Sequence, residues 1–448
     1  NVIAVLGDGS LSGGEALEGL SNAAASGHNI IIVINDNEMS IAENHGGLYT
    51  ALRKLRQSNG TASDNWFKAM GFEYLYVENG NNVVDLIQAF ESFKDTDKPT
   101  IVHIHTLKGK GYSFAQNDKE TWHWNMPFDI KTGKNTVSMA GESYQSITRN
   151  HLIKRVKEDS SIVVVNAATP GAVGFDPEAR AEIADNFVDV GIAEQHAVAF
   201  SSALAKGGCK PVYLCLSSFI QRTYDQLSQD LAINNNPAVI VIFYGSIAAM
   251  NDVTHLGIFD IPLISNIPNI QYLTPTSKAE YLAMLDWAID QKDHPVVIRA
   301  PLDTTVEDVP VLNDYAHVSY QTLHSGKDVA IIAEGSFLTL GKQACAALKE
   351  KGIDATLISP RTVSALDEKT LEALKGSHHL VATLEDGVVC GGFGEKIARF
   401  YGTDDQMKVL CFGAAKAFTD RVPLDELLHR YHLTPEQISA DIVKALKD

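Results

Sequence analysis

Residues 1–40 read NVIAVLGDGS LSGGEALEGL SNAAASGHNI IIVINDNEMS, and this stretch decides the fold. Apolar residues run from Val2 to Leu6 and again from Ile30 to Ile34. Between them, Ser10 to Ser26 carries apolar residues at helical spacing, and Gly27 follows, a residue that favours helix termination. Unbroken apolar, β-branched runs on both sides of a helix are typical of a parallel sheet buried on both faces. The stretch therefore predicts a β-α-β unit.

A polar turn follows each of the two predicted strands: Gly7-Asp8-Gly9 and then Asn35-Asp36-Asn37. Neighbouring parallel strands end at the same edge of a sheet, where open α/β sheets bind ligands. Asp8 and Asn37 would offer one anionic and one neutral oxygen there, a set that suits Mg²⁺. Gly7 and Gly9 would let the backbone approach a diphosphate, whose charge the following helix N-terminus favours. The alternative is two ordinary surface turns, since both tripeptides are common in turns.

The composition limits the class of protein. Hydrophobic residues make up 45% and charged residues 21% of the 448 residues, as in an ordinary globular protein of two or three domains. The formal net charge of −18 argues against nucleic acid and anionic membranes as partners. No apolar run approaches the ~20 residues of a membrane span. The five cysteines lack Cys-x-x-Cys spacing and indicate reduced thiols, so we expect a cytoplasmic location.

The two turns and their surroundings carry a resemblance to a known family. The segments GDGSLSGGEALEGL and NDNEMSIAEN resemble the thiamine-diphosphate motif of the 1-deoxy-D-xylulose-5-phosphate synthases, in the transketolase superfamily. The resemblance implies that Asp8, Asn37 and the Met39 carbonyl bind Mg²⁺ and that Ile41 supports the cofactor. Family members carry a segment before GDG, and we expect this chain to lack it. After Asn44, a polar stretch through Asn65 predicts an exposed helix and loop.

Two later segments acquire a function only through the resemblance. LKGKGYSFAQNDKETWH, from Leu107, is by itself a solvated basic loop or a phosphate-binding loop; the resemblance implies that Lys108 lies near the diphosphate and that His123 lies over the reacting carbon. DVGIAEQHAV contains Glu194, which alone would be a first-turn helix charge. The resemblance makes Glu194 the catalytic residue that hydrogen-bonds the aminopyrimidine ring, with a raised pKa. It also implies ring stacking by Phe219 and proton transfer by His255, although either histidine could be structural.

The chain departs from the family at its acceptor site. Arg222 is retained in the Phe-x-Gln-Arg context, but Tyr244 and Leu302 replace two arginines that bind the acceptor's phosphate in the family, and Asn251 replaces an aspartate. Because bidentate arginine contacts dominate phosphate recognition, these losses predict weakened phosphate binding. We expect substrate contacts from Arg222, Tyr244, Asn251 and His255.

The sequence thus predicts an α/β protein with three consecutive parallel-sheet domains of the transketolase-like architecture. The expected domains are an N-terminally incomplete diphosphate- and Mg²⁺-binding domain (1–138), a pyrimidine-binding domain (139–312) and a C-terminal domain (313–448). The resemblance implies a homodimeric transferase of isoprenoid biosynthesis, with the cofactor at the subunit interface. It would form an enamine from a 2-oxo donor (pyruvate) and add it to an aldehyde, glyceraldehyde 3-phosphate.

Three alternatives stay open. The first is a related enzyme that uses a different, unphosphorylated acceptor or, like transketolase, a ketose donor. The second is a non-catalytic homologue, which would have no need for this set of retained residues. The third is the E1 component of a 2-oxoacid dehydrogenase, which would need a lipoyl partner protein.

Overall fold

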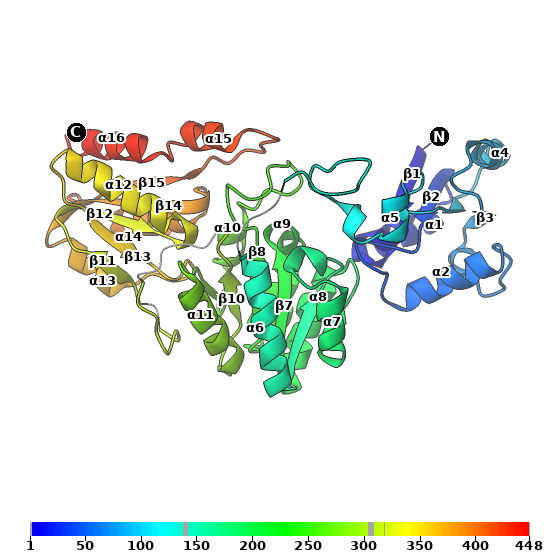
Figure 1. Cartoon of the computed structure of the whole chain (residues 1–448), viewed down its shortest axis with the longest axis horizontal. Coiled ribbons are helices and arrows are strands. Elements are labelled where there is room, and N and C mark those ends of the chain that lie inside the picture. The colour runs from blue at the N-terminus through cyan, green and yellow to red at the C-terminus, as the bar shows by residue number, and fades with distance from the viewer. Residues whose placement is uncertain (1, 138–141, 303–308, 318, 448) are drawn as a thin grey trace. The chain divides into compact units, whose positions relative to one another are not determined.

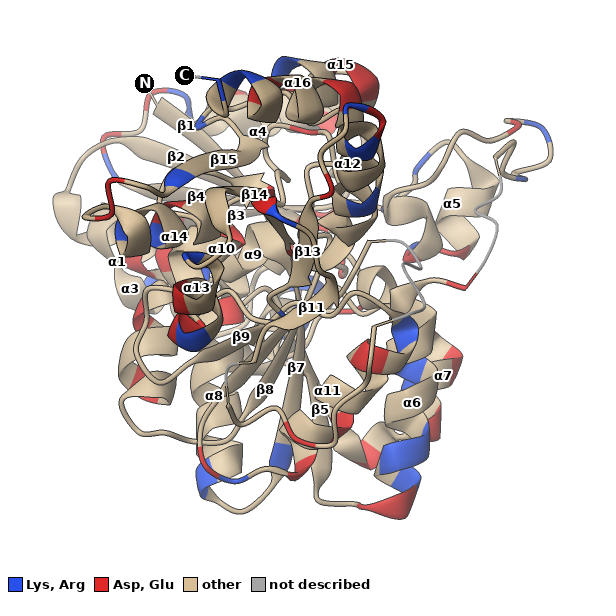
Figure 2. Ribbon diagram, turned by 90° about the vertical axis from the view of Figure 1, so that its left-hand side faces the viewer, with Lys and Arg blue, Asp and Glu red and all other residues tan. Residues whose placement is uncertain are grey.

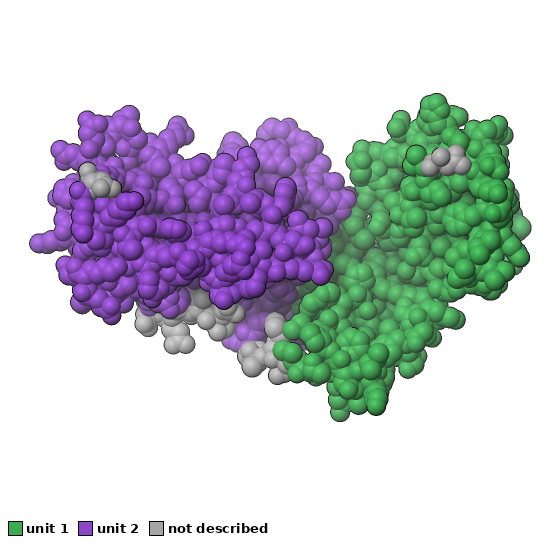
Figure 3. All heavy atoms as spheres, turned by 90° about the horizontal axis from the view of Figure 1, so that it is seen from above, with its two compact units in different colours: residues 1–141, 166–176, 189–193 green, residues 142–165, 177–188, 194–448 purple. Residues whose placement is uncertain are grey.

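The computed structural model describes residues 2–137, 142–302, 309–317 and 319–447. The chain divides into two compact units: unit 1 comprises residues 1–141, 166–176 and 189–193, and unit 2 comprises the remainder (Figure 3). Parallel-sheet α/β layers make up both units, as the sequence predicts. The predicted boundary at 138/139 lies outside the described residues.

Unit 1 is built on a four-stranded parallel sheet in the order β1-β2-β4-β3 (Figure 1). Two apolar clusters cover its faces: one joins the sheet to α1, α2 and α3, and the other joins it to α4. The elements are β1 (Val2–Gly7), a 3-10 helix (Asp8–Ser12), α1 (Gly14–Ser26), β2 (Ile30–Asp36), α2 (Gly47–Gln57), α3 (Trp66–Met70), β3 (Glu73–Val77), α4 (Val83–Phe93), β4 (Thr100–His105), α5 (Ser113–Asn117) and a 3-10 turn (Thr121–His123).

Three expectations for this unit are corrected. The helix predicted from Ser10 begins at Gly14, because a 3-10 helix over Asp8–Ser12 takes up the chain first. The sheet is not buried on both faces throughout: β1 is an edge strand, and Val2, Ile3 and Val5 are exposed. The helix expected to be exposed, α2, buries an apolar face that consists of Tyr49, Leu52 and Leu55.

Unit 2 contains two further sheets. The first has the order β6-β5-β7-β8-β10-β9, and its pairs from β5 to β9 are parallel. Its elements are α6 (Tyr144–Glu158), β5 (Ile162–Asn166), α7 (Pro177–Glu182), β6 (Phe187–Asp189), α8 (Glu194–Lys206), β7 (Lys210–Leu216), α9 (Ser217–Ile220), a 3-10 turn (Gln221–Thr223), a π-helix (Gln226–Ala232), β8 (Val239–Phe243), α10 (Asp260–Ile264), β9 (Gln271–Leu273), α11 (Lys278–Asp290) and β10 (Val296–Arg299). Basic residues mark α6 in Figure 2, and one of them, Arg155, binds Asp290 of α11 at 3.0 Å.

The second sheet of unit 2 has the order β11-β13-β12-β14-β15. All of its pairs are parallel except β11–β13, and β11 is a strand that the sequence pattern does not predict. Its elements are β11 (Gln321–His324), β12 (Asp328–Ala333), α12 (Leu338–Glu350), β13 (Thr356–Ser359), α13 (Glu368–Leu374), β14 (His378–Val388), α14 (Phe393–Tyr401), β15 (Lys408–Ala414), α15 (Leu424–Arg430) and α16 (Pro435–Ala445). None of the helices within the described ranges is both long and apolar enough to cross a membrane.

A buried arginine joins the two sheets of unit 2. Arg299, at the end of β10, donates to the Asp260 carboxylate at 2.7 Å, to Glu334 Oε1 at 3.3 Å and to the Asp386 carbonyl at 2.8 Å. Burial raises the pKa of Glu334 to about 8, against the opposing charge of Arg299. Glu334 directly follows β12 and Asp386 lies in β14, so the guanidinium is one of the polar links between the two sheets.

Candidate functional site

One group of candidate site residues lies in unit 1, where the Gly7-Asp8-Gly9 turn meets the chain after β2. A side chain on Gly9 would place its Cβ 2.6 Å from the Ser40 Cβ, so only glycine fits this contact. The Gly9 carbonyl accepts a hydrogen bond from the Tyr49 hydroxyl at 3.0 Å. By contrast, no atom of the described residues lies within 4 Å of a Cβ built on Gly7, which leaves room for a ligand over that residue. The structure therefore brings together the two turns that the sequence places 29 positions apart.

Asp8 is buried and incompletely paired. Its Oδ2 accepts a hydrogen bond from the Asn44 amide at 2.7 Å, while its Oδ1 and the Asn44 Oδ1 are buried without a hydrogen-bond partner in the described part of the chain. Burial raises the pKa of Asp8 to about 6, and the negative charge of Asp36 adds to the increase. Orphaned buried oxygens are costly unless something binds them, and hard divalent cations bind oxygen. These residues fit Mg²⁺. Asn44 is a candidate Mg²⁺ ligand that the sequence did not indicate.

The Asn37 side chain sits in a tight turn. Its Oδ1 accepts from the Met39 backbone N–H at 3.2 Å, and Asn37, Met39 and Ile41 are all half-buried. Glu38 lies between the first two with φ +67°, a left-handed conformation that is uncommon outside glycine. Asp36 is fully buried beneath the turn. Its burial opposes ionisation, yet the hydrogen bond from His103 and the charge of Arg56 outweigh this and lower the pKa of Asp36 to about 2.

Lys108 and His123 form a pair in the same unit. The Lys108 Nζ donates to the Ser40 carbonyl at 2.5 Å and to the His123 Nδ1 at 3.1 Å. A lysine ammonium has no acceptor, so Nδ1 of His123 accepts and its proton resides on Nε2. Burial lowers the pKa of His123, and the adjacent positive charge of Lys108 lowers it further. His123 is therefore a neutral imidazole that offers an Nε2–H donor at neutral pH.

A separate group of candidate residues lies in unit 2. Glu194 is the first residue of α8 and is only 4% exposed. Its carboxylate binds the guanidinium of Arg222, in the 3-10 turn that follows α9. Burial raises the pKa of Glu194, while the charge and the hydrogen bond of Arg222 oppose the increase. The sequence predicts the raised pKa, but it gives no sign of the arginine that opposes it.

Of the remaining predicted residues of unit 2, two aromatic side chains contact each other, and the others lie in separate loops. The rings of Phe219 and His255 meet edge to face at a centroid distance of 5.5 Å. Asn251, in contrast, uses its amide to donate to the Val422 carbonyl, which connects its loop to the segment between β15 and α15. Tyr244 is half-buried at φ +58°, and its carbonyl lies so close to Gly257 that a Cβ there would be 1.9 Å away. Leu302 is also half-buried.

Comparison with known proteins identifies the family. Residues 1–64 and 58–106 match the model for 1-deoxy-D-xylulose-5-phosphate synthase, residues 142–305 match the pyrimidine-binding domain of transketolase, and residues 319–438 match its C-terminal domain. The 1-deoxy-D-xylulose-5-phosphate synthase of Shouchella clausii is 33% identical over 492 residues, covering 100% of this chain and 77% of the relative. That of Halalkalibacterium halodurans is 32% identical with the same coverage.

The chain belongs to the 1-deoxy-D-xylulose-5-phosphate synthase family. It is a thiamine-diphosphate-dependent transferase, and the resemblance noted in its sequence is confirmed.

Solved structures of transketolases are similar in fold to this family member. A transketolase from Pichia stipitis, in complex with xylulose 5-phosphate, matches 99% of this chain and 75% of its own at 18% identity, with a TM-score of 0.57. A split-gene transketolase described as an inactive β4 tetramer matches 68% of this chain and 99% of its own at 23% identity, with a TM-score of 0.60. At these identities the likeness is one of fold.

Proposed function

We propose that this family member is a Mg²⁺-dependent synthase that joins the two-carbon unit of a 2-oxo acid, pyruvate, to an aldehyde with release of CO₂. The observation that carries the proposal is the buried Asp8: one of its carboxylate oxygens has no hydrogen-bond partner among the described residues, and the other accepts from the Asn44 amide. Asp8, Asn37 and the Met39 carbonyl would bind the cation, and the open space over Gly7 would admit the diphosphate. Thiamine diphosphate, when bound, supplies the electron sink for decarboxylation.

The protein residues would hold protons and position the reactants. Glu194, with its raised pKa, would keep a proton available to the aminopyrimidine ring. His123 would present its Nε2–H to a developing oxygen anion, because Lys108 occupies its Nδ1. His255 would serve in proton transfer beside Phe219, which would stack on the cofactor, and Ile41 would support the cofactor's bent form.

A second candidate concerns the acceptor: an unphosphorylated aldehyde in place of glyceraldehyde 3-phosphate. By the family resemblance, Tyr244 and Leu302 stand where the family has phosphate-binding arginines. The nearby Arg299 has its guanidinium nitrogens engaged by Asp260, Glu334 and backbone carbonyls and is only 4% exposed, so it does not replace them. Arg222 is held by Glu194. We further propose a cytoplasmic homodimer of isoprenoid biosynthesis with the cofactor at the subunit interface, as the family resemblance implies.

The test is an assay of CO₂ release by the purified protein with thiamine diphosphate, Mg²⁺ and pyruvate. Glyceraldehyde 3-phosphate and unphosphorylated glyceraldehyde are supplied in separate reactions. Stimulation by the phosphorylated aldehyde with deoxyxylulose phosphate as product supports the first acceptor, and stimulation only by the unphosphorylated one supports the second. Failure of thiamine diphosphate to bind in the presence of Mg²⁺ would refute the proposed site.

A further inference from the structure

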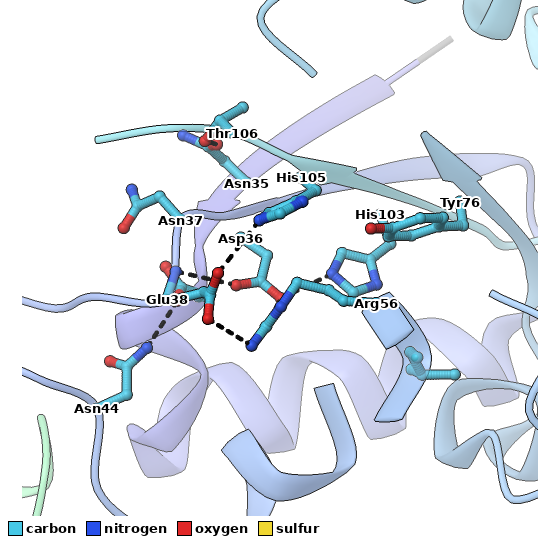
Figure 4. Close-up of polar contacts among 12 residues, drawn as sticks. Asn35, Asp36, Asn37, Glu38, Asn44, Arg56, Tyr76, His103, His105 and Thr106 are labelled. Carbon is cyan, nitrogen blue, oxygen red and sulfur yellow. Dashed lines mark hydrogen bonds and ion pairs between the residues drawn. The ribbon is translucent and has the colours of Figure 1, made fainter. Parts of the chain in front are cut away.

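Asp36, the middle residue of the Asn35-Asp36-Asn37 turn, is held from three sides (Figure 4). Its Oδ2 binds the Arg56 guanidinium and accepts a hydrogen bond from His103 Nε2 at 2.9 Å. Its Oδ1 accepts from the backbone N–H of Glu38 at 3.1 Å. The Asp36 and His103 side chains are 0% exposed and that of Arg56 is 11% exposed, so solvent does not compete for these contacts as it would at a surface turn.

Arg56 binds the two residues on either side of Asn37. One guanidinium nitrogen binds Asp36, and another donates to the Glu38 carboxylate at 3.1 Å. The planar fork of an arginine can span two carboxylates in this way, whereas the single ammonium of a lysine cannot hold both in the same geometry. The two residues that flank the predicted ligand are therefore tied to one rigid group.

His103 completes the arrangement from β4. Its Nε2 donates to Asp36, which leaves Nδ1 to accept the Tyr74 hydroxyl at 2.7 Å. The histidine is thus satisfied on both sides. Glu38 also interacts with His105 at 3.3 Å, so the left-handed residue is fixed by its backbone N–H and by its side chain. A strained conformation of this kind persists only where its surroundings determine it.

We propose that Arg56 and His103 are positioning residues for the cation site: through Asp36 and Glu38 they fix the turn that presents Asn37 and the Met39 carbonyl, without touching the cation. This inference rests on the metal site proposed above. The Asp36 clamp, defined as Asp36 with Arg56, His103 and Glu38, sets how much Mg²⁺ is needed to retain thiamine diphosphate. Pre-ordering of the ligands lowers the conformational entropy lost when the cation binds.

The test compares Arg56→Met and Arg56→Lys with the unsubstituted chain. Lys54→Met is the matched control, because Lys54 is on the same helix but forms an exposed pair with Asp64. Mn²⁺ binding in the presence of thiamine diphosphate is measured by electron paramagnetic resonance, and the melting temperature is measured without ligands. Arg56→Met should raise the Mn²⁺ concentration for half-saturation at least tenfold, Arg56→Lys should raise it less, and Lys54→Met should leave it unchanged.

If Arg56→Met does not fold, Glu38→Gln serves as a second variant. The Glu38 side chain is half exposed, and this substitution removes the Arg56–Glu38 ion pair but keeps the one between Arg56 and Asp36. It should shift Mn²⁺ half-saturation in the same direction by a smaller factor. A lower melting temperature with unchanged Mn²⁺ binding in both variants would overturn the positioning role. If the unsubstituted chain itself binds no Mn²⁺ with thiamine diphosphate, the proposed metal site fails, and the clamp fails with it.

Discussion

Removal of the Arg222 charge should make Glu194 harder to ionise. Arg222 is the cation that opposes the effect of burial on the pKa of Glu194, and the Glu194 side chain is only 5% exposed. A charge-assisted hydrogen bond contributes about 1.5–3 kcal/mol, and one pKa unit corresponds to about 1.36 kcal/mol. Because the Arg222 side chain is 32% exposed, solvent screens the pair and the lower end of the range applies. Arg222→Met should therefore raise the pKa of Glu194 by about one unit.

The consequence can be measured as the pH dependence of cofactor binding. If Glu194 must carry its proton to meet the aminopyrimidine ring, affinity for thiamine diphosphate falls as pH rises through the pKa of Glu194. In Arg222→Met this fall should occur about one pH unit higher, so that the variant binds the cofactor about tenfold more tightly at alkaline pH. Isothermal titration at saturating Mg²⁺, from the ordinary glutamate pKa of 4.5 upward, provides the comparison.

Two further variants define the controls for this titration. Glu194→Gln removes the titrating group and should abolish the pH dependence. Arg430→Met removes an arginine from an exposed pair with Glu426 and should behave like the unsubstituted chain. The reasoning is refuted if Arg222→Met keeps the original pH dependence, since Arg222 would then have no influence on the proton of Glu194.

Three other variants probe the candidate residues of the two units. Asp8→Asn should weaken Mg²⁺ binding by about 10- to 100-fold, as calorimetry with thiamine diphosphate would report, because an anionic ligand is lost. Lys108→Met should raise the pKa of His123 by removing a neighbouring cation, so the acidic limb of the rate profile should move to higher pH; an unmoved limb would exclude His123 as its source. Tyr244→Arg combined with Leu302→Arg should lower the KM for glyceraldehyde 3-phosphate at least tenfold and leave that for unphosphorylated glyceraldehyde unchanged.

The sequence predicts most of the strands because their signal is local. Apolar β-branched runs such as Ile30–Ile34 mark the buried parallel strands, and these lie in the structure where the pattern places them. The edges are harder to predict. β1 carries the same kind of run yet exposes Val2, Ile3 and Val5, because position in the sheet decides burial. β11 is short and partly polar, so its sequence carries no clear strand pattern. It is a strand because it pairs with β13.

The site shows the same limit. Motif spacing marks Asp8 and Asn37 as candidates and the family resemblance marks Glu194, but neither reveals the groups that shift the pKa values of the two carboxyl groups. Arg56 reaches Asp36 only because α2 packs an apolar face on the sheet, and this orientation depends on contacts made over the whole unit. Arg222 meets Glu194 across 28 positions of sequence for a similar reason. Partners of this kind are set by tertiary packing, which no local pattern records.

The buried Arg299 has a consequence for how the chain acquires its structure during synthesis. Its partner Asp260 precedes it, but Glu334 and Asp386 emerge later, the last of them about 90 residues further on. At a translation rate of ~5–20 residues per second, roughly 4–17 s pass between the synthesis of Arg299 and that of its last acceptor, Asp386. Until then Asp260 supplies the opposing charge, and the nitrogens that later meet Glu334 and the Asp386 carbonyl lack these acceptors. The packing of the two sheets of unit 2 around Arg299 should therefore be completed only after translation has passed β14.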